Sequence, residues 1–161
     1  MSWKRRAFFL LNSELALLVV AALAGALAGA APAVADSPVV FALDSSRSLS
    51  IAESRATAEL VKSLLTGVPA AATPGILTFD DEVRWLARPG AIAATGATGA
   101  TGATEANAAL DAMMPGGRFT VLNDGLIEGV RALDKGGVLV LLSDGRDENS
   151  ATTLEDAARL A

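Results

Sequence analysis

The 161-residue chain contains no cysteine, no histidine and no tyrosine, and aromatic residues make up 4% of it. The absence of cysteine excludes disulfides and thiolate nucleophiles, and the additional absence of histidine excludes most zinc sites and imidazole catalysis. Charge is also sparse, since the 13 Lys and Arg residues are scattered and the net charge is −5. No basic stripe that could follow a phosphate backbone is visible, so we expect no nucleic-acid partner.

Apolar residues are abundant, at 52% of the chain, which is enough for one domain with a buried core. Some of them lie near the N-terminus, where Lys4-Arg5-Arg6 precedes an apolar run that ends in the small-residue motif Ala33-Val34-Ala35. We expect residues 1–35 to be a secretory signal peptide and residues 36–161 to be a domain that is exported, either periplasmic or secreted. Leu15 to Ala35 is also just long enough to span a bilayer. An uncleaved membrane anchor is therefore the alternative, and only in that case would a membrane be a partner.

Beyond Ala35, strand-like and helix-like segments alternate, which favours βα units around a parallel sheet. A short stretch at 83–87 follows the acidic turn at 80–82 and predicts an antiparallel edge strand. The other predicted strands are 39–43, 76–79 and 138–142, and the predicted helices are 48–65, 105–114, 122–133 and 154–161. The predicted fold class is α/β, with a Rossmann-like, mostly parallel sheet flanked by helices.

A low-complexity segment interrupts this alternation. Residues 95–103 repeat the tripeptide Thr-Gly-Ala three times, and Thr104 follows. The period is too short for a solenoid repeat, and the glycine content disfavours a stable helix. We therefore predict a mobile surface loop at 95–104.

Polar residues follow two of the apolar strands where each strand ends. Val39 to Leu43 runs into Asp44-Ser45-Ser46-Arg47-Ser48, and Val138 to Leu142 runs into Ser143-Asp144-Gly145. Ligands of open α/β sheets bind beyond the carboxyl ends of the strands, so we expect these two distant loops to meet. The spot where they meet would be rich in oxygen ligands.

The residue types at this spot suit a hard divalent cation. Asp44, Ser46 and Ser48 occupy alternate positions, so in an extended segment they point the same way. Carboxylate and hydroxyl oxygens favour Mg²⁺, with Mn²⁺ or Ca²⁺ as alternatives, over zinc or copper. The candidate metal ligands are Asp44, Ser46, Ser48, Thr120 and Asp144.

Each of these motifs also has a purely structural interpretation. Asp44 could cap the following helix, with Ser46 and Ser48 satisfying its free amides, and Asp144-Gly145 could form a turn. These interpretations together require a coincidence at three separate loops, so the metal site is the favoured interpretation.

The same residues carry a family resemblance. Asp44-Ser45-Ser46-Arg47-Ser48 is similar to the D-x-S-x-S signature of von Willebrand factor A (VWA) domains, known as the metal-ion-dependent adhesion site, or MIDAS. The segment from Thr120 to Leu126 resembles the second motif of that family, and Leu141 to Gly145 resembles the third. The resemblance covers roughly Val39 to Ala161 and implies a Rossmann-like domain that binds Mg²⁺. Ser46, Ser48 and Thr120 would then be hydroxyl ligands, and Asp44 and Asp144 would act directly or through water.

The function implied by this resemblance is that of an exported bacterial protein-binding or adhesion module, whose bound cation captures an Asp or Glu side chain of a protein partner. No pairing of a nucleophile with a base and no phosphate-cradling loop is evident, so we do not expect an enzyme. A metal-dependent hydrolase is one alternative.

The VWA fold continues beyond the third motif, whereas this sequence stops at Ala161, so we expect a C-terminally truncated domain whose strand 138–142 is an exposed edge. A remnant without independent function is therefore the other alternative.

Overall fold

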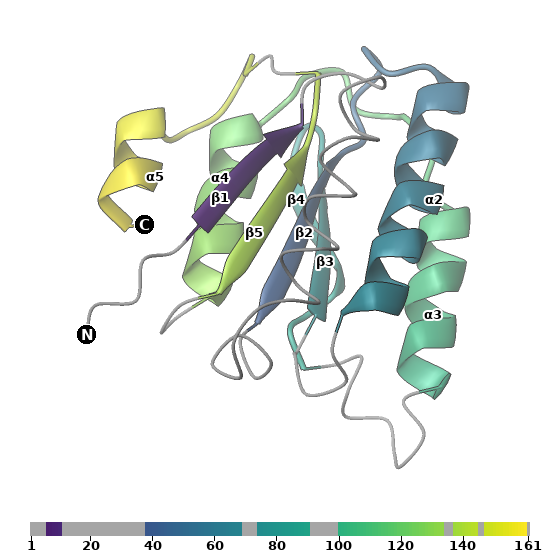
Figure 1. Cartoon of the computed structure of the whole chain (residues 1–161). Helices are drawn as coiled ribbons and strands as arrows, with labels where there is room; N and C mark the ends of the chain where they lie inside the picture. The colour runs from purple at the N-terminus through teal and green to yellow at the C-terminus, as the bar shows by residue number, and fades with distance from the viewer. Residues whose placement is uncertain are drawn as a thin grey trace, which may run out of the picture.

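The computed structural model describes residues 6–10, 38–68, 74–90, 100–133, 137–144 and 147–160. In these segments the chain forms a five-stranded sheet with the order β1-β5-β2-β3-β4, in which the β3–β4 pair alone is antiparallel (Figure 1). The strands are β1 Arg6–Leu10, β2 Val39–Asp44, β3 Pro74–Phe79, β4 Val83–Ala87 and β5 Val138–Leu142. The helices are α2 Ile51–Gly67, α3 Ala100–Asp111, α4 Leu122–Ala132 and α5 Leu154–Leu160. The α/β class with a mostly parallel sheet and one antiparallel edge strand is confirmed.

The central strand β2 is buried on both faces because its successive side chains point to opposite helical layers. Phe41 and Leu43 pack in one cluster with residues of α2 and α3, whereas Val40 and Ala42 pack in a second cluster with residues of α4 and α5. Figure 1 shows the same arrangement, with α2 and α3 on one side of the sheet and α4 and α5 on the other. An apolar run without alternation therefore produces a strand between two helical layers.

Local capping residues fix where two of the helices begin. The Ser50 side chain accepts a hydrogen bond from Glu53 N at 3.2 Å, and Ser50 N donates to Glu53 Oε2 at 2.8 Å, which completes a capping box for α2. Thr153 and Asp156 make the same reciprocal pair before α5, at 3.2 and 3.0 Å. Thr153 therefore caps the start of α5.

The loop predicted at 95–104 is wrong for its second half, because α3 begins at Ala100. Residues 95–99 lie outside the described residues. A glycine in a helix costs up to about 1 kcal/mol relative to alanine. Burial of Ala106 and Leu110 against the cluster beneath α2 stabilises the helix that contains Gly102. Tertiary packing therefore outweighs the composition of the repeat.

The prediction that strand 138–142 is an exposed edge is wrong as well, because β5 is an interior strand of the sheet. Residues Arg6–Leu10 pair in parallel with β5, from Arg6 beside Val138 to Leu10 beside Leu142. An apolar strand with one open edge leaves backbone N–H and C=O groups unpaired, and β1 satisfies them in this chain. The rest of the predicted signal peptide at 1–35 lies outside the described residues, so its role in export stays a prediction. No described helix is long and apolar enough to cross a membrane.

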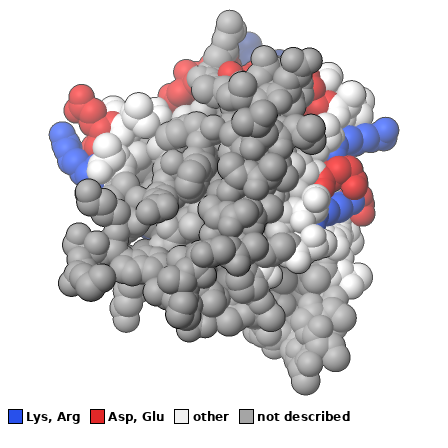
Figure 2. Space-filling view, in the orientation of Figure 1, with Lys and Arg blue, Asp and Glu red and all other residues white. Residues whose placement is uncertain are grey.

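Basic and acidic side chains are mixed on the described surface. On the face shown in Figure 2, the visible Lys and Arg side chains lie close to Asp and Glu at both flanks. Ion pairs among the described residues include Lys62 with Glu59 at 2.8 Å and Arg159 with Asp156 at 3.4 Å. Such exposed pairs contribute little to stability.

Candidate metal centre

The two polar loops singled out in the sequence start side by side. Strands β2 and β5 are parallel neighbours, and their last paired residues are Leu43 and Leu142. The chain therefore leaves the sheet at the same end through Asp44 and through Ser143-Asp144. Because α2 and α4 begin at this end as well (Figure 1), the loops that lead into both helices surround the same spot.

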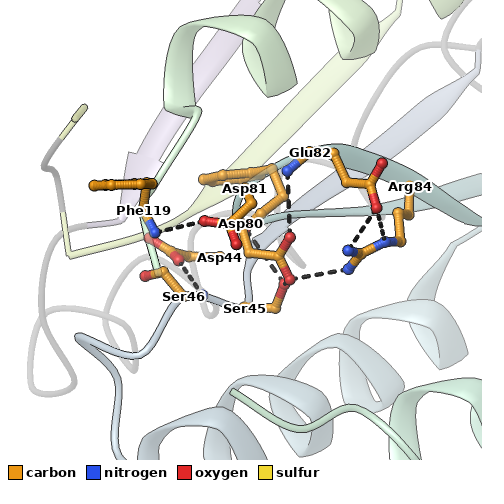
Figure 3. Close-up of polar contacts among 9 residues, drawn as sticks. Asp44, Ser45, Ser46, Asp80, Asp81, Glu82, Arg84 and Phe119 are labelled. Carbon is orange, nitrogen blue, oxygen red and sulfur yellow. Dashed lines mark hydrogen bonds and ion pairs between the residues drawn. The ribbon is translucent and has the colours of Figure 1, made fainter. Parts of the chain in front are cut away.

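The loop after β2 turns its oxygen atoms toward one another. Ser46 N donates to Asp44 Oδ1 at 2.9 Å, and the hydroxyl oxygens of Ser46 and Ser48 are 2.8 Å apart. Asp44 and Ser46 are buried, with exposed fractions of 0% and 2%, and Ser48 is exposed. Figure 3 shows Asp44 and Ser46 close together beneath Phe119. The three oxygen-bearing residues of the first motif therefore form one cluster, which opens to solvent at Ser48.

Capping does not explain this cluster. The N-cap of α2 is Ser50, whose side chain and whose partner Glu53 satisfy the first turn. The structural interpretation of Asp44, Ser46 and Ser48 as the cap of α2 is therefore wrong.

Asp44 carries a buried carboxyl in an unfavourable electrostatic environment. Burial raises the pKa of this carboxyl above its ordinary value, hydrogen bonds from Ser46 and Ser143 offset part of the rise, and the nearby charge of Asp144 raises the pKa further. No Lys or Arg among the described residues forms an ion pair with Asp44. A bound cation would relieve both the desolvation and the repulsion.

Ser143 is a member of this cluster that the sequence interpretation missed. Its Oγ donates to Asp44 Oδ2 at 2.7 Å. Ser143 follows Leu142, the partner of Leu43, so Ser143 lies in register with Asp44. The parallel pairing of the two strands is the signal that could have identified it.

Thr120 lies in the loop that joins α3 to α4, at the same end of the sheet. Its side chain is buried, and its carbonyl accepts a hydrogen bond from Glu148 N at 2.9 Å. The preceding part of this loop runs along the first motif, since Gly116 N donates to Ser45 O and Arg47 N donates to Gly117 O, both at 2.9 Å. Direct contacts thus join Asp44, Ser46 and Ser48. Asp144 acts on Asp44 through its charge, and Thr120 is connected to them through the backbone of its loop.

A glycine allows this close passage of two loops. A Cβ at Gly117 would lie 2.1 Å from the Cβ of Asp80 and 2.9 Å from Asp81 N. The backbone of Gly117 also forms an isolated bridge with Ser46. Gly117 therefore holds the Thr120 loop against the turn that follows β3.

That turn, the acidic turn predicted at 80–82, contains a second buried carboxylate, Asp80. The hairpin between β3 and β4 is confirmed. Asp80 Oδ2 accepts hydrogen bonds from Ser45 Oγ at 3.1 Å and from Arg84 Nη1 at 2.9 Å, and Asp80 Oδ1 accepts one from Glu82 N at 3.3 Å (Figure 3). Asp80 thus ties the β3–β4 hairpin to the first motif.

The adjacent Asp81 holds the other side of the site. Its Oδ1 accepts a hydrogen bond from Phe119 N at 2.7 Å. Backbone hydrogen bonds from Phe119 and Arg118 lower the pKa of Asp81, and the charges of Arg47 and Arg84 lower it further. An ionised Asp81 therefore fixes the residues immediately before Thr120.

The donor set fits a hard divalent cation. All five candidate ligands offer oxygen, and neighbouring oxygens around Mg²⁺ are about 3.0 Å apart in an octahedron with metal–oxygen distances of about 2.1 Å. The separation of 2.8 Å between the hydroxyls of Ser46 and Ser48 is close to that value. The described residues contain no group of three or more His, Cys, Asp or Glu side chains that could hold a metal. A cation here would therefore depend on hydroxyl groups as well as on the two carboxylates.

Comparisons with known proteins bear on the fold. No model of a protein family and no curated protein matches the chain. Among solved structures, proximal thread matrix protein 1 from the mussel byssus is similar, with a TM-score of 0.60 and 18% sequence identity over 78% of this chain. The match covers 35% of that protein's length, so the chain spans about a third of it. At this level of identity the likeness supports a shared mixed α/β fold, consistent with a Rossmann-like domain of the VWA type.

Proposed function

We propose that the chain is an exported, metal-dependent protein-binding module of the VWA type. A divalent cation, Mg²⁺ in the first instance, binds at the carboxyl ends of β2 and β5 and captures an acidic side chain of a protein partner. The ligands are Asp44, Ser46, Ser48, Thr120 and Asp144. The observation that carries the proposal is the buried Asp44 carboxyl, which has a second carboxylate and two converging hydroxyls beside it and no cationic partner among the described residues.

The balance of charged and neutral donors explains why such an ion would seek a partner. Three of the five proposed ligands are neutral hydroxyls, so the ion keeps more of its attraction for anions than it would in a cage of carboxylates. Mg²⁺ prefers octahedral coordination, and five protein donors leave at least one position for water or for an incoming carboxylate. An acidic side chain of a partner fits that position by charge and by geometry.

Three sequence motifs in register and the α/β fold support this proposal together. The D-x-S-x-S segment lies at the end of β2, the Thr120 segment leads into α4, and Asp144 follows β5. Each motif therefore lies in the structural context that its resemblance to VWA domains requires. Export rests on the basic and apolar pattern of residues 1–35.

The proposal is tested by titrating Mg²⁺ into the full chain and into two variants, with heat of binding and thermal unfolding as readouts. Asp44→Asn keeps the size of the side chain and removes its charge. Asp111→Asn makes the same change at an exposed residue of α3 that pairs with Lys62 and serves as the matched control. We expect Mg²⁺ to raise the unfolding temperature of the wild type and of Asp111→Asn, but not of Asp44→Asn. A wild-type protein that is insensitive to Mg²⁺, or an Asp44→Asn variant that responds normally, would refute the proposal.

A further inference from the structure

Exposed apolar side chains concentrate around the candidate metal centre. Five large apolar residues are exposed in the described part of the chain, and three of them lie on the loops of the site or at the start of the helix that follows the first motif. These three are Ile51 at 50% exposure, Met114 at 53% and Phe119 at 38%. The other two, Leu154 and Leu160, lie on α5.

The three side chains belong to the two segments that adjoin the first motif. Ile51 begins α2, three residues after Ser48. Met114 and Phe119 belong to the loop whose residues Gly116 and Gly117 are hydrogen-bonded to Ser45 and Arg47. Phe119 directly precedes Thr120, another of the proposed ligands. Both segments that adjoin the cluster of oxygen ligands therefore carry exposed apolar side chains.

Phe119 is held in a fixed position. Its backbone N–H is bound by Asp81 Oδ1, and the guanidinium of Arg118 lies 5.3 Å from the centroid of its ring. A cation over a ring at this distance is attracted by the π electrons. Because these contacts restrain the residue, less entropy would be lost when a partner covers the ring than for an unrestrained side chain.

Resting on the proposed function, we propose that the site selects an acidic residue flanked by apolar side chains in a protein segment. The carboxylate of that residue binds the cation, while its apolar neighbours cover Ile51, Met114 and Phe119, which act as specificity-determining residues. The exposed Arg47 and Arg118 on the same loops favour an acidic segment through their charge. The ligand is therefore a peptide segment of mixed acidic and apolar character rather than an isolated carboxylate.

The test begins with a display library of random linear peptides selected on the Mg²⁺-loaded full chain and eluted with EDTA. Enriched peptides should share an Asp or Glu with large apolar residues beside it. The affinity of the best peptide is then measured for Phe119→Ser, Met114→Ser and the control Leu160→Ser, whose 39% exposure matches that of Phe119. All three residues are exposed, so we expect these variants to fold.

Each of the two site variants should weaken peptide binding about tenfold, the loss typical of an apolar anchor residue. Leu160→Ser should leave peptide binding unchanged, and the Mg²⁺ midpoint should be the same in all three variants. Enrichment of acidic peptides without apolar neighbours, no enrichment, or equal losses at Leu160 and Phe119 would overturn this inference while leaving the proposed function intact. Absence of Mg²⁺ binding in the wild type would overturn both.

Discussion

Asp44 and Asp80 are both buried carboxylates at the carboxyl ends of neighbouring parallel strands, yet their surroundings differ. Asp80 has a cationic partner within the chain, Arg84 at 2.9 Å, and a hydroxyl donor in Ser45. Asp44 is hydrogen-bonded to Ser46 N and Ser143 Oγ, has the like charge of Asp144 nearby, and has no ion-pair partner among the described residues. Among the described residues, Arg84 neutralises Asp80, whereas no Lys or Arg pairs with Asp44.

We infer that this difference separates a structural role for Asp80 from the proposed metal-binding role of Asp44. A buried charge is tolerated when a partner charge and hydrogen bonds replace the lost water. Asp80 meets this condition and connects the β3–β4 hairpin to the first motif. Asp44 meets only the hydrogen-bonding half of it, so its neutralisation has to come from outside the described residues, either as a proton or as a bound cation.

We expect the largest loss of stability from a substitution at Gly117, which lies between the first motif at Ser46 and the turn at Asp80. A Cβ at Gly117 would overlap that of Asp80 at 2.1 Å, so one loop or the other must move. We expect Gly117→Ala to destabilise the fold by about 3 kcal/mol or more. Urea unfolding monitored by circular dichroism measures the change.

The neighbouring glycine supplies the control for this substitution. A Cβ at Gly116 would meet only Met114 O, at 3.8 Å, so Gly116→Ala should leave the stability within about 0.5 kcal/mol of the wild type. Equal stability of the Gly116→Ala and Gly117→Ala proteins would show that the two loops do not pass as closely as described.

Replacing either Asp44 or Asp80 with Asn, in the absence of divalent cations, compares the contributions of the two carboxylates to stability. Asp80→Asn removes the charge that pairs with Arg84, whose side chain is 51% exposed and partly solvated. We expect a loss of about 1–2 kcal/mol, because a buried charge-assisted network is broken. Asp44→Asn removes a buried charge that the fold disfavours, so we expect a change below about 0.5 kcal/mol in either direction. Urea unfolding at neutral pH measures both.

Added Mg²⁺ should affect the two variants differently. Asp80→Asn keeps the five proposed ligands, so Mg²⁺ should still stabilise it, by about 2.7 kcal/mol at a hundred times the dissociation constant. Asp44→Asn should gain nothing. A larger loss at Asp44 than at Asp80 without metal would mean that Asp44, too, is primarily structural.

The sequence predicted the strands that precede Asp44, Asp80 and Asp144, but it did not predict that Asp80 has a cationic partner and that Asp44 has none among the described residues. Short-range patterns place apolar strands before Asp44 and Asp144, and the alternation of strands with helices predicts that their ends meet. The sequence pattern places Asp80 in an acidic turn but does not predict its burial, because its hydrogen-bond partner Ser45 is 35 positions away. Ser143 was missed because its contact with Asp44 depends on the register between β2 and β5.

Contacts distant in sequence also explain the two errors in the fold. The beginning of α3 at Ala100 depends on packing against α2, which the Thr-Gly-Ala repeat does not encode locally. The pairing of β1 with β5 joins segments more than a hundred residues apart, and the composition of residues 6–10 had suggested a leader. Local sequence patterns thus predicted the helices, the strands and the motifs. They did not predict which strands pair or which strand lies at the edge of the sheet, because these depend on contacts between distant segments.

A third carboxylate, Glu53, has a pKa that is shifted in the direction opposite to that of Asp44. Hydrogen bonds from the Ser50 side chain and backbone lower the pKa of Glu53, the opposite of the shift at Asp44. A lowered pKa in the folded state means that the unfolded chain binds more protons, so the contribution of Glu53 to stability is present above about pH 4.5, its ordinary pKa. That contribution is lost as the pH falls through the lower pKa of the folded state.

Ser50→Ala should therefore cost about 1 kcal/mol at neutral pH, the usual value for a lost N-cap, and should flatten the acid limb of the stability profile. Glu53→Gln keeps the serine cap and removes the titrating group, so we expect it to flatten the same limb with a smaller loss at neutral pH. Unfolding free energies measured across the acidic range provide the check. An unchanged acid limb in both variants would mean that the capping carboxylate carries no charge-dependent stabilisation, and its contrast with Asp44 would then be lost.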